Sequence, residues 1–407
     1  PSNCPKWWLQ EQIPFEFLLL ELNQQKKEEE RNNKKNNREM TTETDDDSST
    51  PFHMSVLQTF RGHEDELVVS AISRDSTVGA TGGEDRKIKL WNLEHDGQAT
   101  DENKSECCLH TLQGHTAWVY GCSFSPDGKT LASSARDRTA KMWDVETGIC
   151  KLTLNGHTGE DVYSSQYSPD GAYISTGSSD HTVRIWDPKR EKQCVCVLGK
   201  DELCSTVWHT DWHPDGQMVV SAGDSGELRV WDIRQPSKSL NPPGKFKMSS
   251  TVHLIYWAEF NRQGTKIATA GSDSRVTVFD VATGDELLAM KGHSSTIRSC
   301  SWSANDRWIF SGGHDRTLRI WNSETGECAQ IRNDHSDWIR SVVVSRDGSL
   351  LLTASGDKTG KLIHFDDFSV KSFKAFCEGL IDQQDDNSPV QLLQSFPHLL
   401  QSVYENL

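Results

Sequence analysis

The stretch TGSSDHTVRIWD, from Thr176 to Asp187, contains the residue types of a Ser-His-Asp hydrolase. In such an enzyme a hydroxyl attacks a carbonyl carbon, an imidazole takes the hydroxyl proton, and a carboxylate orients the imidazole. A catalytic set of this kind is needed once in a chain, whereas a structural set can recur. The number of copies of the stretch therefore decides between a hydrolase and a structural role.

Similar stretches recur along the chain and end in Trp-Asp, Trp-Asn or a degenerate form of that pair. The clearest copies are TGGEDRKIKLWN, SSARDRTAKMWD and SGGHDRTLRIWN, which end at Asn92, Asp144 and Asn322. Weaker copies end at Asp232, Asp280 and His364. The anchor positions of the seven copies are spaced 42 to 52 residues apart and are Trp91, Trp143, Trp186, Trp231, Phe279, Trp321 and Ile363.

Each copy carries polar residues at fixed distances from its anchor. Six copies have an aspartate six residues before it, all seven have a hydroxyl ten residues before it, and five have a histidine farther upstream. Four copies hold the complete set: His63, Thr81, Asp85, Trp91; His115, Ser133, Asp137, Trp143; His157, Thr176, Asp180, Trp186; His293, Ser311, Asp315, Trp321. A set repeated this often indicates structure rather than catalysis, and we predict a protein that is not an enzyme.

A period of about 40 to 45 residues, with Gly-His ahead and Trp-Asp at the end, is typical of WD repeats. From about Val56 to Asp366 the chain resembles the WD-repeat β-propeller family. The resemblance implies an all-β, seven-bladed propeller in which the His, Ser/Thr, Asp and Trp of one blade are hydrogen-bonded to each other. It also implies that Ser55–Phe60 completes the last blade beside Lys361–Phe365. Copies four and five, with Ser225 and Phe279 at key positions, should form less rigid blades.

Composition divides the chain into three parts. We expect residues 1–54 to be a disordered segment or one not native to the protein, residues 55–366 to form the propeller, and residues 367–407 to form a short α-helical tail. A net charge of −16 excludes nucleic acid and an anionic membrane as main partners. The eleven cysteines lack the spacing of a disulfide framework or a zinc site, so we expect no metal, no cofactor, and a cytoplasmic or nuclear location.

Aligning the copies predicts one side chain per blade at the top of the ring, where the family binds peptides. Four consecutive positions are aromatic and the next two are arginines, and further aromatic, Arg and His residues stand nearby. The predicted partner-binding rim comprises Trp118, Tyr120, Arg136, Tyr163, Trp208, Tyr256, Arg298, His314, Trp338 and Arg340. Aromatic and Arg side chains dominate binding energies, and two neighbouring guanidiniums suit a carboxylate or phosphate. The alternative is that these residues only pack against each other around the central channel.

The tail contains SFKAFCEGLI, which resembles the elongin-binding box that opens a SOCS box. The matching residues are Phe373, Cys377 and Ile381, preceded by a small residue. Phe373 stands where Leu is usual, and the cullin-selecting Leu-Pro-x-Pro is reduced to LLQSFPHLL. The alternative is a helical tail that packs on the propeller or binds another partner. A rival signal is WDIR at Trp231–Arg234, which resembles a motif for docking on a cullin-4 adaptor.

Two functions follow from these resemblances. In the first, the chain is the substrate-recognition subunit of a cullin–RING ubiquitin ligase: the propeller binds a target protein or peptide, and the tail binds elongin C and through it a cullin. In the second, it is a WD-repeat scaffold of another multiprotein complex, with no ligase role. In both we expect a monomer within a hetero-complex.

Overall fold

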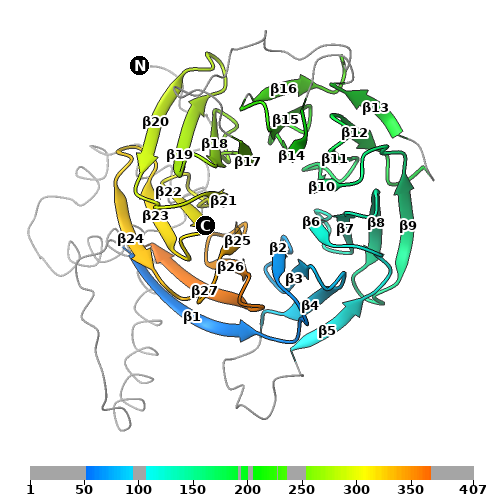
Figure 1. The fold of residues 1–407 in the computed structure, drawn as a ribbon, viewed down its shortest axis with the longest axis horizontal. Helices are drawn as coiled ribbons and strands as arrows, with labels where there is room; N and C mark the ends of the chain where they lie inside the picture. Colours follow the sequence, from blue (N-terminus) through cyan, green and yellow to red (C-terminus); the bar gives the residue numbers. More distant parts are fainter. Residues whose placement is uncertain are drawn as a thin grey trace, which may run out of the picture. The chain divides into compact units, whose positions relative to one another are not determined.

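Seven antiparallel sheets make up the described part of the chain, which in this computed structural model comprises residues 52–94, 107–190, 194–199, 205–226, 228–235 and 254–367. The sheets stand around a common axis in the order of the sequence (Figure 1). The prediction of an all-β, seven-bladed propeller is therefore confirmed. The described ranges contain no helix, and none that could cross a membrane. The predicted helical tail lies outside them.

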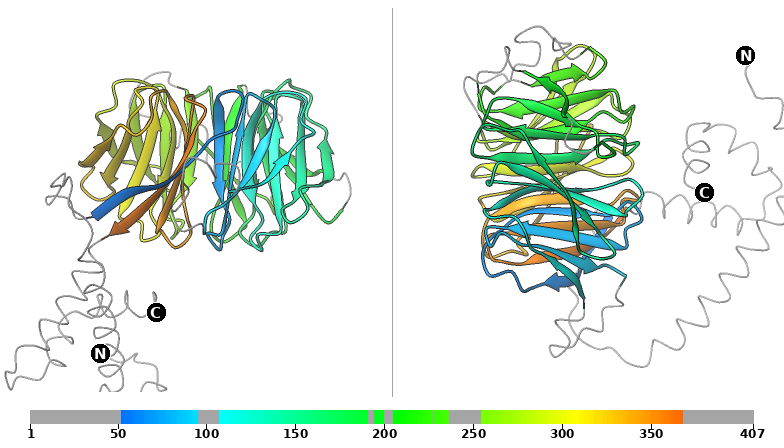
Figure 2. Two further views of the ribbon diagram at one scale, coloured as in Figure 1. Left: turned by 90° about the horizontal axis from the view of Figure 1, so that it is seen from below. Right: turned by 90° about the vertical axis from the view of Figure 1, so that its right-hand side faces the viewer.

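Each blade is a sheet whose strands follow one another from the ring axis outward (Figures 1 and 2). The innermost strands of blades one to seven are β2 (Leu67–Ile72), β6 (Val119–Phe124), β10 (Val162–Tyr167), β14 (Val207–Trp212), β17 (Ile255–Phe260), β21 (Ile297–Trp302) and β25 (Ile339–Val344). The second strands are β3 (Val78–Gly83), β7 (Thr130–Ala135), β11 (Ile174–Ser178), β15 (Met218–Gly223), β18 (Lys266–Gly271), β22 (Trp308–Gly313) and β26 (Leu350–Ser355).

The two outer positions of each blade follow the same order. The third strands are β4 (Ile88–Asn92), β8 (Thr139–Asp144), β12 (Val183–Trp186), β16 (Arg229–Asp232), β19 (Arg275–Asp280), β23 (Leu318–Asn322) and β27 (Gly360–Asp367). The outermost strands are β5 (Cys108–Leu112), β9 (Cys150–Asn155), β13 (Cys194–Leu198), β20 (Glu286–Lys291), β24 (Cys328–Arg332) and β1 (Phe52–Phe60). Within the described residues, blade four has three strands.

The ring closes through its first and last strands. β1 lies antiparallel to β27, with Phe52 opposite Asp367 and Phe60 opposite Gly360. The predicted pairing of Ser55–Phe60 with Lys361–Phe365 lies within this longer ladder, which already begins at Phe52. β1 thus covers the edge of β27 that would otherwise be open to pairing with another chain, and the ring leaves only the short edges typical of a propeller.

Large side chains on the third strands and small ones on the second strands pack the blades together. The seven anchor side chains, from Trp91 to Ile363, are each at most 1% exposed. The second strands are rich in Gly, Ala, Ser and Thr because the next blade packs directly against them. A Cβ atom at Gly82 would lie 2.9 Å from Val119 of blade two, and one at Gly177 would lie 2.7 Å from Val207 of blade four. Larger residues at these positions would push the blades apart.

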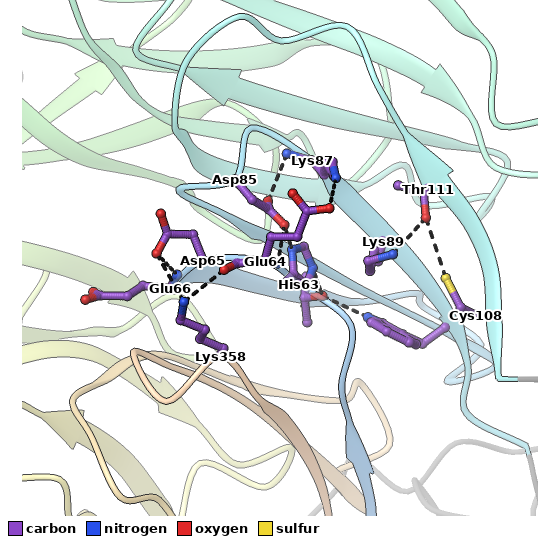
Figure 3. A network of polar contacts seen from close by, with 12 residues as sticks. His63, Glu64, Asp65, Glu66, Asp85, Lys87, Lys89, Cys108, Thr111 and Lys358 are labelled. Carbon is purple, nitrogen blue, oxygen red and sulfur yellow. Dashed lines mark hydrogen bonds and ion pairs between the residues drawn. The ribbon is translucent and has the colours of Figure 1, made fainter. Parts of the chain in front are cut away.

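In five of the seven blades, a buried histidine ties the loop before the innermost strand to the turn after the second strand. In blade two, His115 Nδ1 lies 2.9 Å from Asp137 Oδ2 and His115 Nε2 lies 2.7 Å from Ser133 Oγ. Trp143 donates its indole N–H to the same Ser133 oxygen at 2.8 Å. The same contacts recur in blades one, three and six, and Figure 3 shows them around His63 of blade one. Blade seven has them without the indole, since Ile363 replaces the Trp.

The donors and acceptors of this set fix its protonation. A carboxylate only accepts, so the histidine carries its proton on Nδ1, and Nε2 accepts from the hydroxyl. Burial would raise the pKa of Asp137, but hydrogen bonds from His115, Thr139 and the Thr116 amide hold it well below its usual range. The hydroxyl oxygen of Ser133 is fully buried between the two rings, so it cannot reach a substrate carbonyl. The arrangement is a structural clamp, not a nucleophile.

Blades four and five replace this clamp with contacts between blades. His209 of β14 is 3% exposed, lies 2.9 Å from the Ala258 carbonyl oxygen, and stacks on Trp257 with ring centroids 3.7 Å apart. Burial lowers the pKa of His209 to about 3, so the ring is neutral. Burial and the neighbouring Glu259 raise the pKa of Asp211 to about 8. The degenerate blades therefore hold buried polar groups whose neutral forms are favoured.

We expect the substitution D137A to lower the free energy of unfolding by about 1–3 kcal/mol, because it leaves four donors without their acceptor. These donors are the His115 ring, the Thr116 and Thr139 amides and the Thr139 hydroxyl. The change S225A, at the exposed equivalent position of blade four, should cost far less. Urea unfolding followed by tryptophan fluorescence measures both. Equal midpoints for D137A and the unsubstituted chain would show that the clamp does not stabilise the blade.

Acidification should weaken the fold through His209. When a histidine is neutral in the folded protein, the free energy of unfolding decreases as the pH falls below about 6.5, because only the unfolded state binds the proton. Between pH 7 and pH 5 this amounts to about 2 kcal/mol. Asp211 and Glu259 have raised pKa values and act in the opposite direction, but they are common to the unsubstituted chain and H209Q. H209Q should therefore lose less stability over this interval, and an equal loss in the two proteins would contradict the assignment.

Candidate functional site

Every innermost strand has a β-bulge near its first residue, and the bulged residue is the one that the repeat alignment places at the rim. In β14, for example, Val207 pairs with Gly223 and His209 pairs with Ala222, which leaves Trp208 without a partner across the ladder. A bulge turns a side chain out of the alternating pattern of its strand. The seven bulged residues are Val68, Tyr120, Tyr163, Trp208, Tyr256, Arg298 and Arg340.

A second backbone contact brings another residue of each blade to the same end of the ring. The residue that follows the second strand donates its N–H to the carbonyl of the residue two positions before the bulge. The His314 amide lies 2.8 Å from the Thr296 oxygen, and the Arg136 amide lies 2.9 Å from the Trp118 oxygen. A Cβ atom at Gly313 would lie 2.7 Å from that Thr296 oxygen, so glycine permits the close approach. The rim is this end of the ring, where three residues of each blade converge.

The predicted aromatic residues form a continuous row at the rim. Ring centroids are 5.0 Å apart between Tyr120 and Tyr163, 4.1 Å between Tyr163 and Trp208, and 5.2 Å between Trp208 and Tyr256. Trp118 adds a fifth ring, 6.4 Å from Tyr120. We call these five residues the aromatic arc; it spans blades two to five. All five are half-buried, so each keeps a solvent-facing part that a ligand can cover.

The other predicted rim residues extend the arc or lie on the far side of the axis. The guanidinium carbon of Arg136 lies 5.2 Å from the Trp118 ring centroid, and that of Arg298 lies 4.2 Å from the Tyr256 centroid. Across blades six and seven, His314 stacks on Trp338 at 4.1 Å, and Trp338 is 42% exposed. Burial, together with Arg298 and Arg340, lowers the pKa of His314 to about 4, so this ring is neutral at neutral pH.

Acidic residues outside the predicted partner-binding rim pair with it. Arg340 of blade seven donates to Glu84 at 3.0 Å and also to Glu66, both in blade one. Arg136 lies 3.4 Å from Asp161, which also accepts the Tyr163 hydroxyl proton at 3.1 Å. Trp208 donates its indole N–H to Asp224. Burial raises the pKa of the Glu84 carboxyl, and the charge and hydrogen bond of Arg340 offset part of this increase.

The repeat pattern holds a signal for these acids. Glu66 and Asp161 stand two residues before a bulged residue, the position that Trp118 and Trp338 occupy in blades two and seven. Asp224 and Glu84 directly follow a second strand, the position of Arg136 and His314. These two positions, taken in all seven copies, place the acids at the rim. They do not indicate which arginine each acid contacts.

The remaining predicted sites fall elsewhere. Phe373, Cys377 and Ile381 lie outside the described residues. In WDIR, Arg234 donates to the Asp232 carboxylate through Nε at 2.8 Å and Nη2 at 2.6 Å, so its guanidinium is already engaged within the motif. In the described ranges, no group of three His, Cys, Asp or Glu side chains could hold a metal ion.

The chain shares its repeats with a large family. Residues 54–92, 106–144, 148–187, 192–232, 284–322 and 326–364, more than half of the chain, match the family described as "WD domain, G-beta repeat". Most of the matched segments begin at the outermost strand of one blade and end with the third strand of the next. The three inner strands of blade five, which lacks both the histidine and the tryptophan, fall outside the matched segments, and the blade still folds as a four-stranded sheet.

Several curated proteins are similar. Nuclear distribution protein PAC1 of Arthroderma benhamiae is 27% identical over 289 residues, which cover 68% of this chain and 44% of that protein. Transcriptional corepressor LEUNIG_HOMOLOG of Arabidopsis thaliana is 26% identical over 72% of this chain and 29% of its own length. Pre-mRNA-processing factor 19 of Mus musculus is 32% identical over 23% of this chain and 18% of its own length. The chain thus spans less than half of each of these relatives, and by its repeats it belongs to the WD40 repeat family.

Proposed function

We propose that this protein-interaction scaffold binds an extended segment of a partner protein across the rim, with the aromatic arc as its main contact. The observation that carries the proposal is the row of five half-buried rings, four of which are set by bulges in consecutive blades. The names of the three relatives refer to nuclear distribution, corepression and pre-mRNA processing. A likeness to all three does not select one of these roles, so the proposal rests on the rim itself.

Three physical properties favour binding at the arc. Large aromatic side chains bury much area while losing little rotamer freedom, and they dominate the energy of most protein interfaces. The bulges and hydrogen bonds such as Tyr163 to Asp161 hold the rings in place before a partner arrives, which lowers the entropic cost of binding. Neighbouring rings of the arc also contact each other, so each one supports the position of the next. These properties suit a protein segment rather than a reacting small molecule.

We further propose that the chain is the substrate-recognition subunit of a cullin–RING ubiquitin ligase. The support is the spacing of Phe373, Cys377 and Ile381, which matches an elongin-binding box, and its place after the last blade. The rival docking motif is less favoured because Arg234 is bound to Asp232. A scaffold of another complex, without a ligase role, is the alternative. The eight described cysteines are all unpaired, which supports a cytoplasmic or nuclear location.

Substituting the central ring of the arc should abolish partner capture. W208A removes the residue that contacts Tyr163, Tyr256 and Arg298, and hot-spot truncations of this kind cost about 2 kcal/mol or more, roughly thirtyfold in affinity. The measurement compares, by quantitative mass spectrometry, the proteins retained from a cell lysate by the immobilised full chain and by W208A.

The matched control is Y173A. Tyr173 is also half-buried and stacked on a tryptophan, but it follows the turn at the opposite end of β10. Proteins retained by the full chain and by Y173A, but lost with W208A, support the rim. If every retained protein survives W208A while both variants remain folded, the partner binds elsewhere on the chain.

The tail proposal has its own test. The double change F373S and C377S removes apolar area from the two positions that an elongin-type helix buries, and at about 25 cal/mol per Å² the affinity for elongin C should fall more than tenfold. Titration calorimetry with purified elongin C measures the dissociation constant, and F396S, outside the motif, is the control. Absence of binding by the unsubstituted chain at micromolar concentration would leave the scaffold without a ligase role.

A further inference from the structure

Two of the three arginines named at the rim are paired with acidic residues there, and among the described residues the third, Arg298, is not. Arg340 is held by Glu84 and Glu66, and Arg136 lies beside Asp161. Asp224 accepts the Trp208 indole proton. These pairs use all four carboxylates named at the rim. They also change the expectation that Arg298 and Arg340 together would hold an anion, because Arg340 already has two acidic partners.

Arg298 is the exception within the described part of the chain. Its guanidinium carbon lies 4.2 Å from the Tyr256 ring centroid and 5.6 Å from the Trp208 ring centroid. No carboxylate lies within ion-pair distance of it there. Burial and the like charge of Arg340 lower the pKa of Arg298, and a hydrogen bond with the Tyr256 side chain opposes this, yet an arginine stays protonated in proteins. The arc thus ends in a half-buried positive charge that contacts the faces of Trp208 and Tyr256 and the Tyr256 hydroxyl.

Such a charge is costly to leave without an anion. A buried or half-buried ion is normally paired, because the protein replaces water poorly as its solvent. The two ring faces offset part of this cost through cation–π attraction, which also fixes the plane of the guanidinium. The other basic groups nearby carry no negative charge, since His314 is neutral and Arg340 is a cation. The counter-ion has to come from the partner.

We propose that Arg298 is an anion-binding position that selects partner segments with an acidic group, a carboxylate or a phosphate, next to the residues that cover Trp208 and Tyr256. This inference rests on the proposed binding of a protein segment at the rim and names the chemistry of that segment. The planar guanidinium offers two parallel N–H groups to either kind of oxygen acid. The acidic group would therefore lie between blades five and six, and apolar side chains of the same segment would cover the arc.

The test uses three pools of fluorescein-labelled nine-residue peptides with randomised flanks and a fixed central residue: glutamate, phosphoserine or glutamine. Fluorescence anisotropy with the full chain should give at least tenfold tighter binding for one or both anionic pools than for the glutamine pool. The preference of one anionic pool over the other identifies the source of the anion. Raising the salt from 50 to 500 mM should weaken the anionic pools much more than the glutamine pool.

Variants assign the effect to one side chain. R298Q should bind the three pools equally, and R298K, which keeps the charge but not the planar fork, should retain a reduced preference if R298Q unfolds. R307Q is the matched control, because Arg307 is exposed on the same blade beyond the opposite end of β21. Equal binding of the three pools by the unsubstituted chain, or a preference that survives R298Q, overturns the anion position while leaving rim binding intact. No binding of any pool overturns both.

Discussion

In five of the seven blades, the hydrogen bonds of a buried histidine hold the segments that carry the rim residues. In blades one, two, three, six and seven the ring joins the loop before the innermost strand to the turn after the second strand through one carboxylate and one hydroxyl. Both segments end at the rim, and the bulge lies within a few residues of the histidine's loop. The buried clamp therefore fixes the bulged side chains of five blades. In blades four and five, which lack it, the same bulge and the same backbone contact beside it hold Trp208 and Tyr256 at the equivalent positions.

The rim combines this regular backbone with an irregular choice of side chains. The bulge is the same in all seven blades, but its residue is apolar in blade one, aromatic in blades two to five, and basic in blades six and seven. The backbone contact that places His314 beside Thr296 likewise recurs with different side chains. The fold thus supplies equivalent positions, and the sequence at these positions supplies specificity. An aromatic arc that ends at a cation is a surface suited to a segment with apolar residues followed by an acidic one.

Much of this could be predicted from the sequence, because repetition averages out local ambiguity. Seven copies of one pattern determine the number of blades, the closing strand pair and the register, so the clamp residues and the ten rim residues could be named in advance. Contacts between side chains that are distant in the sequence could not be predicted in this way. Arg340 meets Glu84 and Glu66 only because blade seven lies beside blade one, and no local pattern encodes that contact. The bulge could not be predicted either, since one extra residue does not change the composition of a short strand recognisably.

Hydrogen exchange on the full chain, with and without a captured partner, tests the central claim that the rim is the binding surface. Partner binding should slow amide exchange at the start of the innermost strands of blades two to six. This part of the rim includes Trp118, Tyr163 and Trp208. Exchange in the turns at the opposite end, such as Ser125–Gly128, should stay unchanged. Protection confined to those turns or to the outermost strands, with no change at the rim, would contradict the account.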